Sequence, residues 1–210
     1  IIFNTESKDF AFEGLNIKCV HTPGEKRYGK RMLNALKHVK TEYVLLLLDD
    51  FFLRSSVSAE ELCKIISWMK NDENIAYFNC DPLETYADYE VDKYPGFKRV
   101  PPANAYTLNM QAAIWRTEIF KEFWRPNASP WEWEMIYNIL TIDYPKYKFY
   151  CVKSAKNMFL DYGHYVFGDI WGVYRGKWVT KDVEPLFRKE NIDVDFSILG
   201  AYSVEDFNKK

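Results

Sequence analysis

The sequence predicts an α/β protein in which a mostly parallel sheet is flanked by helices. Residues 1–80 alternate short apolar runs with segments of helical period, which is the pattern of a doubly wound sheet. The run YVLLLL, residues 43–48, contains no charged residue, as expected for a strand that is buried on both faces of such a sheet. With 210 residues, 48% of them hydrophobic and 28% charged, the chain is long and apolar enough to form one globular domain.

The first half of the chain supplies the alternating elements. Its strands are short apolar runs that end in polar residues, and its helices carry apolar residues at every third or fourth position. We expect strands at 1–6, 16–22, 43–48 and 75–80, and helices at 25–39 and 58–69.

The second half of the chain is less regular. Residues 86–105 are polar and contain prolines, so they predict a loop, and residues 161–178 are rich in glycine and aromatic residues, which also predicts a loop. Between and after them we expect strands at 106–116 and 148–152 and helices at 117–124, 127–140 and 184–192.

Composition excludes several classes of protein. A net charge of −2 gives no basic surface for nucleic acid. No apolar run approaches the roughly 20 residues that span a bilayer. The four cysteines form no CxxC pair, so they predict no zinc site and are typical of a reduced, cytoplasmic protein. Because the chain begins at Ile1 without a signal-like segment, we expect an upstream segment in the gene product.

Asp49 and Asp50 follow the run 43–48 directly, at the strand end where parallel sheets bind ligands. Carboxylate oxygens are hard ligands for Mg²⁺ or Mn²⁺, which often share their coordination with substrate phosphates. A metal held there stabilises a departing diphosphate as a Lewis acid. The structural alternative is that one aspartate caps the next turn and the other pairs with a lysine or arginine.

Two segments resemble a known family. Residues 35–53, ALKHVKTEYVLLLLDDFFL, resemble the segment that carries the DXD-type motif in GT-A glycosyltransferases, and residues 109–135, NMQAAIWRTEIFKEFWRPNASPWEWEM, resemble the acceptor half of that family. The resemblance covers roughly residues 1–180 and is closest to family 2-like bacterial sugar transferases of surface-polysaccharide biosynthesis.

This resemblance implies a Rossmann-like, GT-A-like sheet in which Asp49 and Asp50 bind Mn²⁺ or Mg²⁺ and the ribose of a nucleotide-sugar. It also implies that the chain lacks the first βα unit of the family, because residues 1–6 resemble the second strand. The single domain then divides into three parts: residues 1–82 as the nucleotide-sugar and metal half, residues 103–180 as the acceptor half with the C-terminal loop, and residues 181–210 as a C-terminal helix and tail.

The stretch SPWEWE predicts a helix start, with Ser129 as N-cap, Pro130 at N1 and Glu132 completing a capping box. Glu132 precedes an apolar series at helical spacing, so we expect it on the inward face, where a carboxylate can act as general base toward a sugar hydroxyl. The cap explains Glu132 without catalysis, whereas the family holds an acidic base in this turn, so both alternatives stay open. Glu134, on a more polar face, is the second candidate base.

Two tryptophans and three charged residues are further candidates. Trp131 and Trp133 either pack in the core or offer a stacking face to an acceptor sugar. Arg175 and Lys177 can neutralise a diphosphate, or they form a solvated basic turn. In GT-A enzymes a C-terminal histidine often completes the metal site, and the resemblance assigns that role to His164; a lone histidine is more often structural.

The sequence therefore predicts an enzyme, a metal-dependent glycosyltransferase that moves a sugar from a nucleotide-diphosphate sugar to a glycan or lipid-linked glycan, with inversion. We expect a cytoplasmic location, with proximity to the inner face of the membrane if the acceptor is lipid-linked. Two alternatives remain: a nucleotidyltransferase acting on a sugar phosphate, which would need a glycine-rich phosphate loop, and a non-catalytic carbohydrate-binding module, which would not need two adjacent aspartates.

Overall fold

The main body of the protein is a six-stranded sheet. A computed structural model describes residues 1–83, 89–90, 93–162 and 172–202. The strands lie in the order β3-β7-β4-β8-β6-β5. They are β3 (Tyr43–Leu46), β7 (Ala113–Arg116), β4 (Ile75–Asn79), β8 (Lys148–Val152), β6 (Phe97–Val100) and β5 (Tyr89–Glu90).

The α/β class is confirmed, but the expected mostly parallel sheet is wrong, because the sheet is mixed. Only β4 and β8 pair in parallel, and the other neighbouring strands are antiparallel. β3 and β4 run in the same direction, as the strand-helix-strand pattern predicts, but β7 lies between them and pairs antiparallel with both. β3 is consequently an edge strand, and its residues are only partly buried rather than covered on both faces.

Two expected loops contain short strands. Residues 86–105 include β5 and β6, which extend the large sheet, and residues 161–178 include β9 (Val173–Tyr174) and β10 (Lys177–Trp178). Conversely, of the strand expected over 106–116, only β7 forms. Strands of two to four residues are too short to leave a periodic signal in the sequence.

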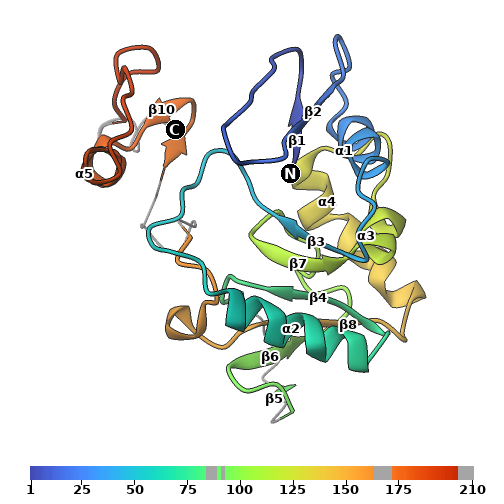
Figure 1. Ribbon diagram of the computed structural model, residues 1–210. Helices are drawn as coiled ribbons and strands as arrows, with labels where there is room; N and C mark the ends of the chain where they lie inside the picture. Colours follow the sequence, from blue (N-terminus) through green and yellow to red (C-terminus); the bar gives the residue numbers. More distant parts are fainter. Residues whose placement is uncertain (84–88, 91–92, 163–171, 203–210) are drawn as a thin grey trace.

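The two N-terminal strands form a sheet of their own. β1 (Ile2–Thr5) and β2 (Lys18–His21) pair in parallel and are not hydrogen-bonded to the large sheet. α1 (Tyr28–Leu36) follows them and connects to β3. Figure 1 shows this small sheet beside the β3 edge of the large one.

Helices cover both faces of the large sheet and enclose two hydrophobic cores (Figure 1). α2 (Ala59–Asn71) packs on one face through Ile65 and Met69. On the other face lie α1, α3 (Thr117–Phe123), α4 (Pro130–Met135) and the 3₁₀ helix η1 (Tyr137–Asp143). A second 3₁₀ helix, η2 (Ala155–Asn157), follows β8.

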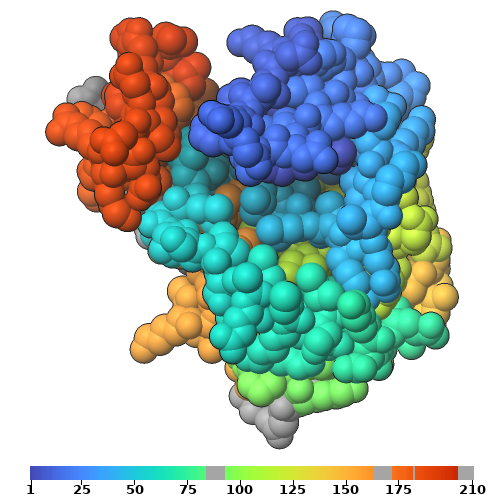
Figure 2. Space-filling view, viewed as in Figure 1, coloured from blue at the N-terminus to red at the C-terminus, as the bar shows by residue number. Residues whose placement is uncertain are grey.

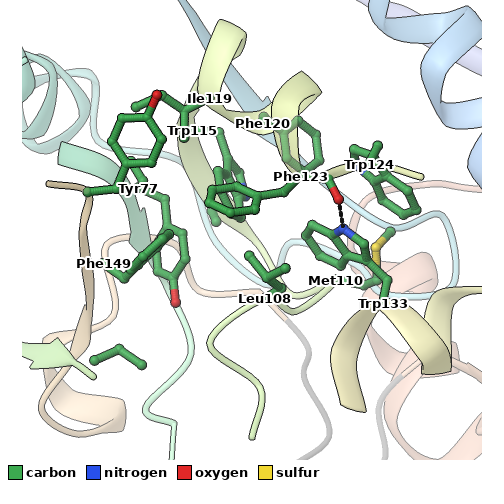
Figure 3. Close-up of a cluster of buried hydrophobic side chains, with 14 of the residues drawn as sticks. Tyr77, Leu108, Met110, Trp115, Ile119, Phe120, Phe123, Trp124, Trp133 and Phe149 are labelled. Atoms are coloured by element: carbon green, nitrogen blue, oxygen red, sulfur yellow. Dashed lines mark hydrogen bonds between the residues drawn. The ribbon is translucent and has the colours of Figure 1, made fainter. Parts of the chain in front are cut away.

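Aromatic side chains dominate the core beneath α3 and α4. The rings of Trp124 and Trp133 stack in parallel with centroids 4.5 Å apart, and Trp115 stacks on Phe120 at 4.7 Å. Figure 3 shows Trp133 reaching into this cluster, where its indole nitrogen donates a hydrogen bond to the carbonyl oxygen of Phe123 at 3.2 Å. The α4 backbone is therefore fixed from below by a buried tryptophan.

The C-terminal segment carries β9, β10 and α5 (Thr180–Lys189) and extends from the main body, as the orange and red part of Figure 1 shows. It contacts the segment after β3, because Phe52 packs on Trp178 at 6.2 Å and on Phe187 at 5.0 Å. In the part of the chain described, no helix has both the length and the apolar character needed to cross a bilayer.

Candidate active site

A cavity of about 700 Å³ lies at the carboxyl end of β3. Five separate segments line it, so its shape depends on the whole fold rather than on one motif. The lining residues are Tyr28, residues 48–51, Met110, Gln111, Pro130, Trp131, Glu134 and residues 173–175. On the side of the molecule that Figure 2 shows, the surface is hollowed between the blue N-terminal segment and the cyan segment that follows β3.

Hydrogen bonds on both sides hold the two aspartates in place. The Tyr162 hydroxyl accepts a hydrogen bond from the Leu48 amide and donates one to the Leu48 carbonyl, both at 2.7 Å. On the other side, the Val173 amide donates to the carbonyl of Asp50 at 2.8 Å. The chain therefore leaves β3 along a fixed path that points Asp49 and Asp50 at the cavity.

Gly172 allows the C-terminal segment to approach this closely. Its φ is +94°, and a Cβ at this position would lie 1.9 Å from the carbonyl oxygen of Asp50. Only glycine fits such a contact, because any side chain would overlap the backbone. Nothing in the sequence indicated that a glycine in a predicted loop positions the aspartates.

The Asp50 side chain is half-buried, and no positive charge in the described part of the chain compensates its carboxylate. Burial raises its pKa, and the nearby Asp49 raises it further. Its Oδ1 atom is shielded from solvent and has no hydrogen-bond partner, and neither aspartate forms an ion pair within the described residues. A buried carboxylate oxygen without a partner is costly unless a cation or a donor occupies the site.

A divalent cation fits this donor set only in part. Carboxylate oxygens are the ligands that Mg²⁺ and Mn²⁺ prefer, and the orphaned oxygen of Asp50 is available to one. However, no group of three histidine, cysteine, aspartate or glutamate side chains gathers anywhere in the described ranges. Asp49 and Asp50 can supply two ligands, and substrate phosphates and water would have to supply the rest. His164 lies outside the described residues.

Glu132 acts as a helix cap. Its carboxylate accepts hydrogen bonds from the amide and the hydroxyl of Ser129, each at 2.8 Å, and its own amide donates to that hydroxyl at 3.2 Å. These bonds lower the pKa of Glu132. The predicted capping box is confirmed, but Glu132 is exposed and does not line the cavity.

The expected orientation of this helix is wrong. Met135, Ile136 and Ile139, the apolar series expected to face inward with Glu132, are exposed. The buried positions are instead Trp133, Asn138 and Thr141. The polar pair faces inward because it binds backbone: the Leu108 amide donates to Asn138 at 2.6 Å and the Ala103 amide donates to Thr141 at 2.7 Å.

This orientation places Glu134 in the cavity. Its carboxylate accepts a hydrogen bond from the Met110 amide at 2.7 Å, and burial raises its pKa. A carboxylate with a raised pKa is a stronger base than one in water, so Glu134 is better suited than Glu132 to accept a proton.

The two candidate tryptophans have different surroundings. Trp131 is exposed and lines the cavity, so a sugar ring can stack on it. Trp133 is fully buried beneath α4 (Figure 3). Of the two alternatives for Trp133, the structure supports packing in the core, and the side chain offers no surface on which an acceptor could stack.

Of the two basic candidates, only Arg175 lines the cavity. Its guanidinium lies 5.4 Å from the centre of the Tyr174 ring, and its φ of +50° places it in the left-handed region. Lys177 lies opposite Tyr174 in the β9–β10 hairpin and is not among the lining residues.

Sequence reasoning missed Tyr28 and Gln111 as lining residues. Burial raises the pKa of Tyr28 to about 12, and the nearby carboxylates Asp49, Asp50 and Glu134 contribute, so its hydroxyl remains a hydrogen-bond donor. The Oε1 atom of Gln111 is buried, and none of the described residues donates a hydrogen bond to it. In the sequence, the one indication that Gln111 has a special role is its position inside an otherwise apolar run.

Comparison with known proteins gives no assignment: no family model matches the chain, and no curated protein matches it either. The functional argument therefore depends on the cavity and its side chains.

Proposed function

We propose that this protein is a metal-dependent glycosyltransferase of the GT-A type that uses a nucleotide-diphosphate sugar as donor. The observation that carries the proposal is the cavity itself, which joins Asp49, Asp50, Glu134 and Arg175 from three parts of the chain. Sugar transfer requires three kinds of group: a pair of carboxylates that can bind a cation, a base with a raised pKa and a guanidinium that can bind phosphate.

Each group has a defined task in the proposed reaction. Asp49 and Asp50 would hold Mg²⁺ or Mn²⁺, which would neutralise charge on the departing diphosphate. Arg175 would bind the same diphosphate in bidentate fashion. Glu134 would take the proton of the acceptor hydroxyl as its oxygen bonds to the anomeric carbon and the bond to the diphosphate breaks, which gives inversion. Trp131 would stack against the acceptor, a glycan or lipid-linked glycan, and His164 remains a candidate third metal ligand.

The alternatives explain the cavity less well. A carbohydrate-binding module would use Trp131 but has no need for a buried carboxylate such as Asp50. A nucleotidyltransferase shares the acidic site, and no feature of the described residues favours it over sugar transfer.

Calorimetric titration tests the proposal. We expect UDP-, GDP- or CMP-sugars to bind the 210-residue chain in the presence of Mn²⁺ and to bind at least tenfold more weakly without it. Asp50→Ala should abolish the metal-dependent binding and leave the melting temperature unchanged or higher, because it removes a half-buried, uncompensated charge. Asp193→Ala, at an exposed position, is the matched control and should bind as the wild type does. Metal-independent binding in the wild type would contradict the assignment of Asp49 and Asp50.

A further inference from the structure

One exposed face of the molecule is strongly apolar. Five large side chains on α4, on η1 and at the residue between them are between 53% and 74% exposed, and none is charged. We call them the apolar ridge: Trp131, Met135, Ile136, Ile139 and Ile142. Tyr106, 45% exposed, extends the ridge, because its amide donates to the carbonyl of Glu134 on the same helix.

The chain's own packing does not account for this face. The inward positions of the same helices carry Asn138 and Thr141, which bind the backbone of residues 103–108. The apolar positions are therefore exposed to water, which is unfavourable for apolar surface. Exposed apolar patches of this size usually mark a contact site. Tyr106 also has a φ of +63°, a conformation that is uncommon for a bulky residue outside functional or contact sites.

The exposed area is close to that of a protein interface. Given 150–250 Å² for a large side chain, the ridge and Tyr106 together present roughly 600 Å² of surface. This is at the upper end for a patch on a monomer and approaches the roughly 800 Å² per partner of a standard interface. Tryptophan, tyrosine and methionine are also residue types enriched in such contacts.

The charge distribution favours a second copy of this chain as the partner. A two-fold contact brings a surface against itself, so like charges within the surface would repel each other. The ridge has none, and charged residues lie only at its ends: exposed Glu132 at the start of α4, and exposed Asp143 and Lys146 at and just beyond the end of η1. In an antiparallel pair of α4–η1 segments, Glu132 of each copy would face the end of η1 in the other copy, which carries both Asp143 and Lys146.

A bilayer surface fits less well. Interfacial helices normally combine an apolar face with lysine or arginine that binds anionic headgroups, and no ridge residue is basic.

We propose that the chain forms a two-fold homodimer through the apolar ridge. This inference does not rest on the proposed enzymatic activity, although both use Trp131. Because Trp131 belongs both to the ridge and to the lining of the cavity, the dimer would place the two cavity openings beside the interface.

Sedimentation equilibrium between 1 and 100 μM tests the dimer. We expect a mass of twice 25.0 kDa at the higher concentrations. Ile139→Lys should be monomeric, with at least a hundredfold weaker association and an unchanged far-ultraviolet spectrum and melting temperature. Ile198→Lys, which changes an even more exposed isoleucine away from the ridge, should remain dimeric.

Other results would overturn the proposal. A wild type that is monomeric at 100 μM contradicts it, as does an Ile139→Lys variant that remains dimeric. Lys146→Glu should weaken the dimer at least fivefold, and an unchanged dimer would exclude the antiparallel arrangement. A monomer that sediments with phosphatidylcholine vesicles, but not after Ile139→Lys, would assign the ridge to a membrane surface instead.

Discussion

Glu132 and Glu134 lie two positions apart on α4, and their carboxylates have different partners. Glu132 is bonded to Ser129 at the helix start, in solvent, whereas Glu134 points into the cavity beside the Met110 amide. Two substitutions of the same type therefore distinguish a cap from a base.

We predict that Glu134→Gln lowers kcat at least a hundredfold and leaves donor binding within twofold, because the amide cannot accept the proton. Since burial raises the pKa of Glu134, the wild-type rate should begin to fall on acidification at a higher pH than an ordinary carboxyl group would give. Glu132→Gln should retain activity and lower the melting temperature only slightly through the weakened cap. Steady-state kinetics against pH and thermal melts measure both. Full activity in Glu134→Gln would remove it as the base.

For single residues, the sequence predicted correctly those features that depend only on neighbours in the chain. Ser129, Pro130 and Glu132 form the predicted cap because capping involves only adjacent positions. The different burial of Trp131 and Trp133 could not be predicted, because the side that faces inward is decided by Asn138 and its contact with Leu108, thirty positions away.

Among the elements, the β9–β10 hairpin holds the segment that carries the aspartates. The contact depends on Gly172, whose absent side chain leaves room for the carbonyl of Asp50. Gly176, in the same hairpin, also has a positive φ, of +73°, but a Cβ there would meet no atom within 4 Å. Gly172 is therefore required both because of its positive φ and because a side chain would overlap Asp50, whereas Gly176 is required only because of its positive φ.

We predict that Gly172→Ala destabilises the protein by more than about 3 kcal/mol or displaces the hairpin, and that it abolishes metal-dependent donor binding. Gly176→Ala should cost only about 1–2 kcal/mol for its left-handed backbone and retain binding. Thermal melts and calorimetric titration measure the two effects. Equal behaviour of the two variants would mean that the close approach to Asp50 has no role in the site.

The elements also show why the strand pattern was predicted better than the sheet. Apolar runs located β1, β2, β3, β4 and β8, because burial is a property of each segment. Strand direction and strand order are not properties of a single segment. β7, for example, lies between β3 and β4 although it comes later in the chain. The edge position of β3 follows from that order and could not be read from YVLLLL.

For the whole molecule, a buried acidic group at the end of β4 should make stability depend on pH. Asp81 is buried, and its amide donates to the side chain of Asn79 at 2.6 Å. Asn79 in turn donates to Asn109 at 2.7 Å, which accepts from the amide of cavity-lining Gln111 at 3.0 Å. This polar row connects the interior of the sheet to the candidate site.

Burial raises the pKa of Asp81 from 3.8 to about 7. Below pH 3.8 both folded and unfolded chains hold the proton, and between pH 3.8 and 7 only the folded chain holds it. The stability that this proton contributes is therefore complete at low pH and is lost as the pH rises through about 7. We predict that Asp81→Asn stabilises the protein at pH 8 by up to about 4 kcal/mol and has little effect at pH 4. Asp193→Asn, at an exposed position, should leave the pH dependence unchanged. Chemical denaturation across this pH range measures the difference. If the Asp81→Asn variant kept the wild-type pH dependence of stability, that dependence would arise from another group.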